Sequence, residues 1–157
     1  TNMHLQFLRG GEAGDPVEYT VTRVFDVFGA GENTGRLVAS LLRTLRAGET
    51  FICRHGQLER DYMAAEDVGE ALAHVVASDV AGPVNIGAGR SIALGELARM
   101  AAARLGAGGR LVVETRPAPG HPLAMRADVA RLRNDAGAPP PQPLDIHLDR
   151  LILRPGR

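Results

Sequence analysis

Three glycines, Gly29, Gly31 and Gly35, follow an apolar run that ends at Phe28 and precede a stretch with helical spacing. A glycine-rich turn between a strand and a helix can cradle the phosphates of a dinucleotide, because backbone amides at a helix N-terminus point at the anion. The spacing here, G-x-G-x-x-x-G, is one residue longer than the usual one. Arg54 stands near the position where a 2′-phosphate would be met. The turn is therefore either a cofactor loop or a loop with another purpose.

Metal and hydrolase chemistry have little support from residue spacing. The chain has three serines, and none can be assigned to a Ser-His-Asp arrangement. Four of the histidines share no metal-ligand spacing with Cys53 or with one another: His4, His55, His74 and His147. We predict neither a metal site nor a hydrolase.

Composition excludes several further classes of protein. The chain has 157 residues, enough for one domain with a substantial core, and 45% of them are hydrophobic. Its 18 basic and 18 acidic residues cancel, and only 4% are aromatic, which argues against binding to nucleic acid. No apolar run reaches the length of a membrane helix. The single cysteine favours a cytoplasmic location.

Hydrophobic periodicity predicts alternating strands and helices, and hence an α/β fold. The predicted extended segments are 17–28, 51–53, 60–64 and 111–114, with a further brief strand in GPVNIGAG (82–89) that runs into a glycine turn. The predicted helical segments are 2–9 (the end of a helix), 37–45, 67–76 (capped by Asp67), 94–105, 125–136 and 145–153. Too few strands remain after Gly29 to build a doubly wound sheet around that turn, which weakens the cofactor-loop interpretation.

Five stretches in order, beginning with VTRVFDVFGAG and ending with RADVARLRNDAG, resemble the C-terminal half of the NAD-dependent epimerase/dehydratase family. The others are RLVASLLRTLRAGE, RDYMAAEDVGEAL and NIGAGRSIALGELA. These extended short-chain dehydrogenases act on nucleotide sugars, and the resemblance covers about residues 17–153. It implies that the whole chain, 1–157, is one substrate-binding C-terminal portion without a separate second domain. It also implies that the turn at Gly29 faces the substrate.

The family's chemistry requires NAD or NADP and a Tyr-x-x-x-Lys pair, in which the lysine lowers the pKa of the tyrosine. All 18 basic residues of this chain are arginines, so neither Tyr19 nor Tyr62 can belong to such a pair. We therefore expect the N-terminal Rossmann core to be absent from this chain, which begins with Thr1. We also expect that the chain alone binds no cofactor and is inactive.

The resemblance assigns binding of the sugar nucleotide to particular residues. Arg60, in the Arg-Asp-Tyr motif, matches an arginine that reaches the substrate diphosphate; the alternative is a pair with Glu59, Asp61 or Glu66. Arg116 resembles a second such arginine, or else is a solvated loop residue. The remaining candidates are His121 at a ribose-binding position, Arg36 and Leu37 at the start of the helix over the base, and Phe51 and Cys53 in the base pocket or the core.

Three positions depart from the family pattern. Asp26 replaces the asparagine that binds the substrate phosphate, and a carboxylate repels a diphosphate unless a cation intervenes. Ala30 and Ala64 replace a proline and a histidine. These departures favour an unusual substrate or a degenerate site.

Three functions remain open. The chain is the sugar-nucleotide-binding portion of an NAD(P)-dependent epimerase, dehydratase or reductase; or it is a non-catalytic binding module; or, least favoured, it is a small oxidoreductase that uses the turn from Gly29 to Gly35. Such a portion would leave a strand edge and apolar faces uncovered, so we expect a missing N-terminal half or a second copy as its partner.

Overall fold

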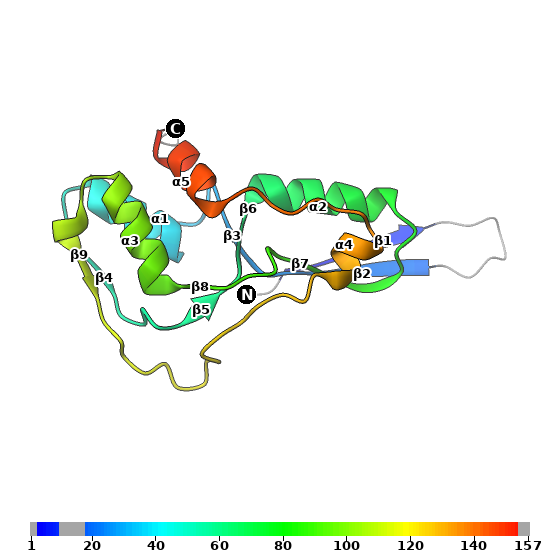
Figure 1. The fold of residues 1–157 in the computed structure, drawn as a ribbon, viewed down its shortest axis with the longest axis horizontal. Helices are drawn as coiled ribbons and strands as arrows, with labels where there is room; N and C mark the ends of the chain where they lie inside the picture. The colour runs from blue at the N-terminus through cyan, green and yellow to red at the C-terminus, as the bar shows by residue number, and fades with distance from the viewer. Residues whose placement is uncertain (1–2, 10–17, 154–157) are drawn as a thin grey trace.

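Two hydrophobic cores lie at opposite ends of an elongated α/β molecule (Figure 1). The structure, a computed structural model, describes residues 3–9 and 18–153. One core surrounds a three-stranded sheet, and the other lies among three helices and a pair of short strands. The predicted α/β class is confirmed.

The sheet at one end has the order β1-β2-β7. It contains β1 (Met3–Arg9), β2 (Glu18–Val24) and β7 (Gly82–Ile86), with β1 antiparallel and β7 parallel to β2. Helix α2 (Ala65–Ala77) runs along one face of this sheet (Figure 1). The core between them consists of buried aliphatic side chains, among them Val24, Val75, Val84 and Ile86.

The outer edge of β7 is sealed by side chains rather than by another strand. Arg131, in the short helix α4 (Ala130–Asn134), donates hydrogen bonds to the carbonyl oxygens of Ala81 at 2.8 Å and Pro83 at 2.6 Å. Pro83 has no backbone N–H to offer. Asn85 donates through Nδ2 to the carbonyl oxygen of Asp128 at 2.9 Å. Two backbone carbonyl groups at this edge are therefore used within the molecule.

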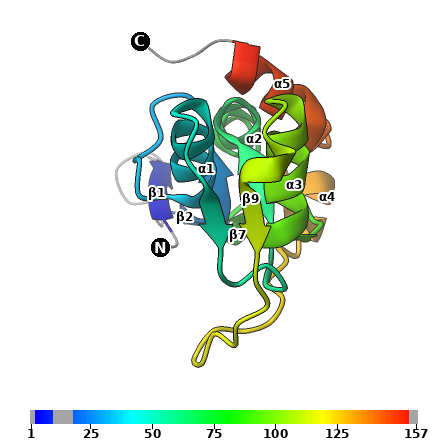
Figure 2. The same cartoon turned by 90° about the vertical axis from the view of Figure 1, so that its left-hand side faces the viewer.

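The second core lies between helices α1 (Leu37–Arg46), α3 (Leu94–Arg104) and α5 (Leu144–Leu153), which appear together in Figure 2. Its strands are β4 (Phe51–Cys53) and β9 (Leu111–Val113), which pair in parallel, and the 3-10 turn Gly108–Arg110 precedes β9. Helix α1 buries one apolar stripe, as its spacing predicts: Val38, Leu41, Leu42 and Leu45.

A short strand pair connects the two cores. Strand β3 (Asp26–Phe28) lies parallel to β6 (Tyr62–Ala64), and β5 (Glu59–Arg60) pairs with β8 (Ile92–Ala93). Because side chains alternate along a strand, Phe28 packs into the helical core while its neighbour Val27 packs against the core of the sheet. Each core therefore holds part of the same two strands.

The structure corrects the prediction of a helix end over residues 2–9. Residues 3–9 form β1, and Asn2 lies outside the described residues. Seven consecutive residues pair with β2, from Met3 opposite Val24 to Arg9 opposite Glu18. Pairing with a strand nearby in the sequence outweighs the local helical pattern, because tertiary context overrides propensity.

Three further predictions were partly wrong. The strand predicted over 17–28 divides at Phe25, whose N–H donates to the carbonyl oxygen of Ile86, so that β2 and β3 pair with different strands. Of the helix predicted over 125–136, only α4 forms, because the amides of Met125 and Ala127 bond to Glu59 and Asp61 instead. Asp67 does not cap α2: it lies in the first turn, and Ala64 occupies the cap position.

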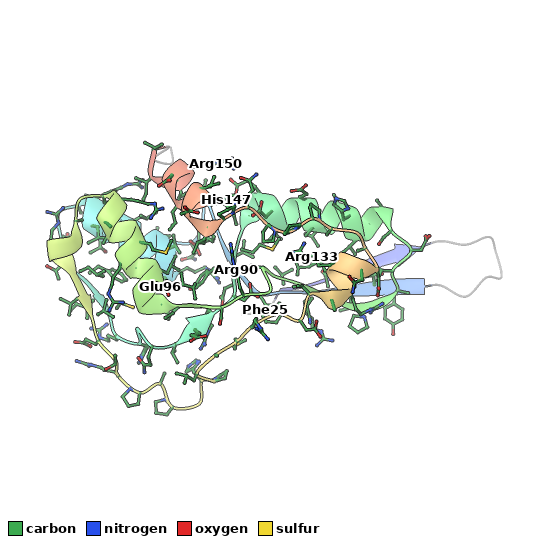
Figure 3. All side chains as sticks on the ribbon, in the orientation of Figure 1. Phe25, Arg90, Glu96, Arg133, His147 and Arg150 are labelled. Carbon is green, nitrogen blue, oxygen red and sulfur yellow. The ribbon has the colours of Figure 1, made fainter. Side chains whose placement is uncertain are left out.

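The carboxylate of Asp67 instead anchors α5. It accepts hydrogen bonds from the backbone N–H of Gln142 at 3.2 Å and binds Nε2 of His147 at 2.8 Å. Both side chains of the Asp67–His147 pair are buried. Figure 3 labels His147 and Arg150 on α5, above the middle of the molecule.

Within the part of the chain that the structure describes, no helix is long and apolar enough to cross a membrane.

Candidate functional site

A cavity of about 460 Å³ lies beside the strands that connect the two cores. Asp26 of β3, Arg60 of β5 and Tyr62 of β6 line one side of it, and His121 lines it from the long loop after β9. The other lining residues are His55, Leu58, Leu94, Pro117, Ala118 and Pro119. Three residues predicted to bind substrate, Asp26, Arg60 and His121, are thus brought together.

Arg60 is held by the backbone, not by a carboxylate. Its Nη1 donates to the carbonyl oxygens of Glu59 at 2.6 Å and Pro122 at 3.1 Å. Among the described residues, no hydrogen bond uses its Nε or Nη2, and no ion pair joins it to Glu59, Asp61 or Glu66. A guanidinium fork with two free donor nitrogens fits two oxygens of a phosphate.

Asp61, between Arg60 and Tyr62, is buried and does not itself line the cavity. It is 1% exposed and accepts three backbone hydrogen bonds, from Ala88 at 2.7 Å, Gly89 at 2.9 Å and Ala127 at 3.0 Å. Burial raises the pKa of this carboxyl group, and the three amides and Arg90 oppose that rise. The carboxylate therefore fixes the strands that carry Arg60 and Tyr62 to the turn after β7, where Arg90 lies (Figure 3).

Tyr62 presents a hydroxyl group that stays protonated. Burial and the nearby Asp26 carboxylate raise the pKa of Tyr62 above its ordinary value. A tyrosine that takes a proton from a sugar hydroxyl needs the opposite shift. Tyr62 is therefore suited to donating a hydrogen bond to a ligand in the cavity.

Asp26 has the cationic partner that a carboxylate near a diphosphate requires. Its Oδ1 lies 3.2 Å from Nη2 of Arg36, and the same nitrogen donates to the carbonyl oxygen of Val27 at 3.3 Å. Arg36 also binds Glu32, with 2.8 Å between Nε and Oε1. The repulsion expected from Asp26 is thus reduced by an arginine from the turn before α1.

The glycine turn lines a second cavity, of about 330 Å³. It is lined by residues from the end of β2 to the turn before α1, and by Ala65 of α2: Val24, Phe25, Val27, Phe28, Gly29, Ala30, Gly31, Glu32, Asn33, Arg36 and Ala65. Gly31 has φ +79°, a conformation that glycine adopts without strain. Phe25, labelled in Figure 3, lies near the middle of the molecule.

This turn does not fit the pyrophosphate of a dinucleotide. The carboxylate of Glu32, only 7% exposed, lies close to the amide of Ala39 in the first turn of α1. Burial raises the pKa of this carboxyl group, and its hydrogen bond with Arg36 opposes that rise. The group already lies at the helix terminus at which a phosphate would bind. Strand β3 also pairs with β6 alone among the described residues, so no doubly wound sheet surrounds the turn.

The remaining predicted residues are not among those that line the 460 Å³ cavity. Arg116 is 62% exposed and pairs with Glu114 at 2.7 Å, while its carbonyl oxygen accepts from Gln57 at 2.7 Å. Phe51 and Leu37 pack against the helical core, and Cys53 is buried within it, where burial raises the pKa of its thiol. Arg36, described above, lines the cavity at the glycine turn.

Sequence reasoning did not assign Tyr62, His55 or Glu32 to the site. Tyr62 could have been predicted, because it lies two residues after Arg60 in an extended segment, and side chains two residues apart point to the same face. His55 and Glu32 occur in loops, where no periodicity indicates which way a side chain points.

Among the described residues, no group of three or more His, Cys, Asp or Glu is arranged to hold a metal ion.

Short parallel strands, helices packed against them and a cavity lined by Arg60 make this part of the chain an α/β lobe. Residues 6–87, just over half of the chain, match the model of the NAD dependent epimerase/dehydratase family. The chain belongs to this family.

Similar proteins are considerably longer than this chain. UDP-glucuronic acid decarboxylase 1 of Xenopus tropicalis is 27% identical over 139 residues, which cover 87% of this chain and 33% of that protein. UDP-glucose 4-epimerase from Thermotoga maritima, whose structure was solved with UDP-glucose, is 25% identical to this chain. The two structures superpose with a TM-score of 0.76 over 87% of this chain and 45% of the epimerase chain. UDP-N-acetylglucosamine 4-epimerase from Methanobrevibacter ruminantium M1 is 20% identical over the same shares, with a TM-score of 0.78, and shares the fold. The chain thus spans from a third to less than half of these relatives.

Proposed function

We propose that this chain is the sugar-nucleotide-binding portion of an NAD(P)-dependent epimerase, dehydratase or reductase. The observation that carries the proposal is Arg60, which lines the 460 Å³ cavity with Nε and Nη2 free of hydrogen bonds among the described residues. A sugar nucleotide brings a diphosphate, the group that such a fork binds best. Family membership and the UDP-glucose bound by the Thermotoga maritima relative support this choice of ligand.

The cavity provides complementary roles for three side chains. Arg60 binds diphosphate oxygens, Tyr62 donates a hydrogen bond from its protonated hydroxyl, and His121 approaches from the opposite loop. Asp61 keeps Arg60 and Tyr62 in place through its three backbone contacts. The net effect is to hold the nucleotide end of the substrate.

Hydride transfer belongs, in this proposal, to a part of the protein that supplies the cofactor. The sequence contains no lysine for the family's Tyr-x-x-x-Lys pair, and the raised pKa of Tyr62 does not suit a base. The glycine turn does not fit a dinucleotide, for the reasons given above. The residues of this chain therefore bind and orient the substrate.

A second candidate is a non-catalytic binding module. Asp26, in place of the asparagine expected from the resemblance, favours it, because the carboxylate must be neutralised by Arg36 before a phosphate can approach. This module would bind the same ligands without any cofactor-dependent partner.

Calorimetric titration of the chain with UDP-glucose, NAD and NADP tests the proposal. We expect UDP-glucose to bind, and Arg60→Ala to weaken binding about tenfold to a hundredfold, because a hydrogen bond to a charged group contributes about 1.5–3 kcal/mol. Arg43→Ala, which removes an exposed arginine of α1, is the control and should leave binding unchanged. The proposal would be contradicted if the chain bound NAD but not UDP-glucose. It would also be contradicted if the Arg60 and Arg43 variants bound UDP-glucose equally well.

A further inference from the structure

A third cavity, of about 310 Å³, lies where α3 and the start of α5 meet strands β6 and β8. Of the residues that line it, Tyr62 alone also lines the cavity of Arg60, and none lines the cavity of the glycine turn. Its volume falls in the range of about 300–1,000 Å³ that small-molecule sites commonly have. We call it the interhelix cavity.

Much of the lining of the interhelix cavity is apolar. Ile92 of β8, Met100 of α3 and Leu144 of α5 pack against the helical core but are only partly buried, so they leave apolar surface to the cavity. An unbranched methionine side chain adapts to the shape of what it contacts. A ligand with an apolar body would gain by removing this surface from water.

Three exposed charged side chains also line the interhelix cavity: Arg90, Glu96 and Asp145. Asp145 already faces a cation, because its Oδ2 lies 3.9 Å from Nη2 of Arg104. Among the described residues, the side chains of Arg90 and Glu96 form no hydrogen bond and no ion pair, with each other or with any other group. Figure 3 labels Arg90 near the middle of the molecule and Glu96 on α3. One unpaired charge of each sign therefore remains at this cavity.

The two unpaired charges gain meaning from their position. An exposed charge by itself indicates no ligand, because water solvates it. Arg90 and Glu96, however, border the same apolar lining and do not neutralise each other. A purely anionic ligand would be repelled by Glu96, and a purely cationic one by Arg90. The arrangement is complementary to a ligand that carries one charge of each sign and an apolar group.

We propose that the interhelix cavity binds a free α-amino acid with an apolar side chain. Arg90 binds its carboxylate, for which a guanidinium fork is well shaped, and Glu96 binds its ammonium group. The apolar side chain of the ligand lies against Met100 and its neighbours in the cavity. This site goes beyond the proposed function and does not depend on it, because no sugar nucleotide takes part.

The chain offers an optical readout for such a ligand. It contains no tryptophan and two tyrosines, Tyr19 and Tyr62. Tyr19 is 58% exposed on β2, so Tyr19→Phe should be tolerated. In that variant the fluorescence comes from Tyr62, which lines the interhelix cavity and reports on a ligand bound there.

The test titrates the Tyr19→Phe chain with L-leucine and three analogues: leucinamide, which lacks the carboxylate, N-acetylleucine, which lacks the ammonium group, and glycine, which lacks the side chain. We expect leucine to change the emission of Tyr62 saturably, and each analogue to bind at least about fivefold more weakly. Calorimetry of the unaltered chain provides an independent measurement. Leucine that gave neither a saturable change in fluorescence nor a heat of binding would overturn the inference, and so would an analogue that bound as tightly as leucine.

Two variants assign each charge of the ligand to its partner. Arg90→Ala should weaken leucine at least about fivefold without weakening leucinamide, which has no carboxylate to bind. Glu96→Gln should weaken leucine similarly without weakening N-acetylleucine, which has no ammonium group. Both side chains are exposed, so the variants should fold, and Arg43→Ala and Glu49→Gln at other exposed sites are the controls. Leucine binding that was unchanged in both cavity variants would contradict the inference.

Discussion

Asp61 shows how one buried side chain can organise a cavity that it does not line. Its two carboxylate oxygens accept from three amides on two separate segments, the turn after β7 and the residues that precede α4. Gly87 is required beside it, because an added Cβ would lie 2.5 Å from Cβ of Ala127 and 3.1 Å from the carboxylate. The residue thus joins segments that are far apart in the sequence.

Replacing Asp61 by asparagine should therefore destabilise the whole chain. The amide group of asparagine would direct a donor at backbone N–H groups, so at least one hydrogen bond to a charged acceptor is lost, at a cost of about 2–4 kcal/mol. Urea unfolding measures the change in the free energy of unfolding. Glu70→Gln, on the exposed side of α2, should change it by less than about 0.5 kcal/mol. Equal stability of the two variants would refute the role assigned to Asp61.

Among the elements, α5 depends on contacts at both of its ends. The Asp67–His147 pair fixes its first half to the start of α2, and Phe28 packs edge-on against the ring of His147 at 6.3 Å. At its other end, Arg46 of α1 donates to the carbonyl oxygens of Leu151 and Ile152. These contacts, together with the packing of Leu148 in the helical core, hold α5 in place.

His147→Ala should loosen α5 before the rest of the fold. The substitution leaves the buried Asp67 carboxylate with one hydrogen bond fewer and removes ring packing, so we expect amide exchange within Leu144–Leu153 to become at least about tenfold faster. His74→Ala, at a half-exposed site on α2, is the control. Hydrogen-exchange mass spectrometry separates the two helices. Unchanged exchange in α5 would show that the His147 contact does not hold it.

Sequence reasoning succeeded for elements with clear periodicity and failed where distant contacts decide. The stripe of α1 and the extended residues 60–64 were predicted correctly, because spacing alone indicates the buried face. The break at Phe25 depends on Ile86, and the short length of α4 depends on Asp61. Such bonds join residues about sixty positions apart, which no local pattern reveals.

The candidate site, like the fold, could be predicted in part from the sequence. The resemblance to the family indicated Arg60 and Asp26, and the structure places both at one cavity. The position of Arg36 between Asp26 and Glu32 could not be predicted, because the turn that aims it has no regular period. The roles in binding of all the predicted site residues stay predictions: Asp26, Arg36, Leu37, Phe51, Cys53, Arg60, Arg116 and His121.

For the whole molecule, exposed apolar side chains indicate surfaces that another chain or segment would cover. Tyr19 on β2 is 58% exposed, and Ile52 and Val112, which lie opposite each other in β4 and β9, are 42% and 44% exposed. We still expect association with a second copy or with the rest of a longer protein. Sedimentation equilibrium over a range of concentrations tests this, and a monodisperse monomer that binds no hydrophobic dye would contradict it.

The sealed outer edge of β7 limits what such association can become. A sheet that polymerises by strand addition needs an open edge at each end, so that every added copy offers a new template. Here Arg131 and Pro83 block one end of the three-stranded sheet, and among its described strands the outer edge of β1 remains. Pairing of two copies through that edge would leave this sheet no open edge for a third copy.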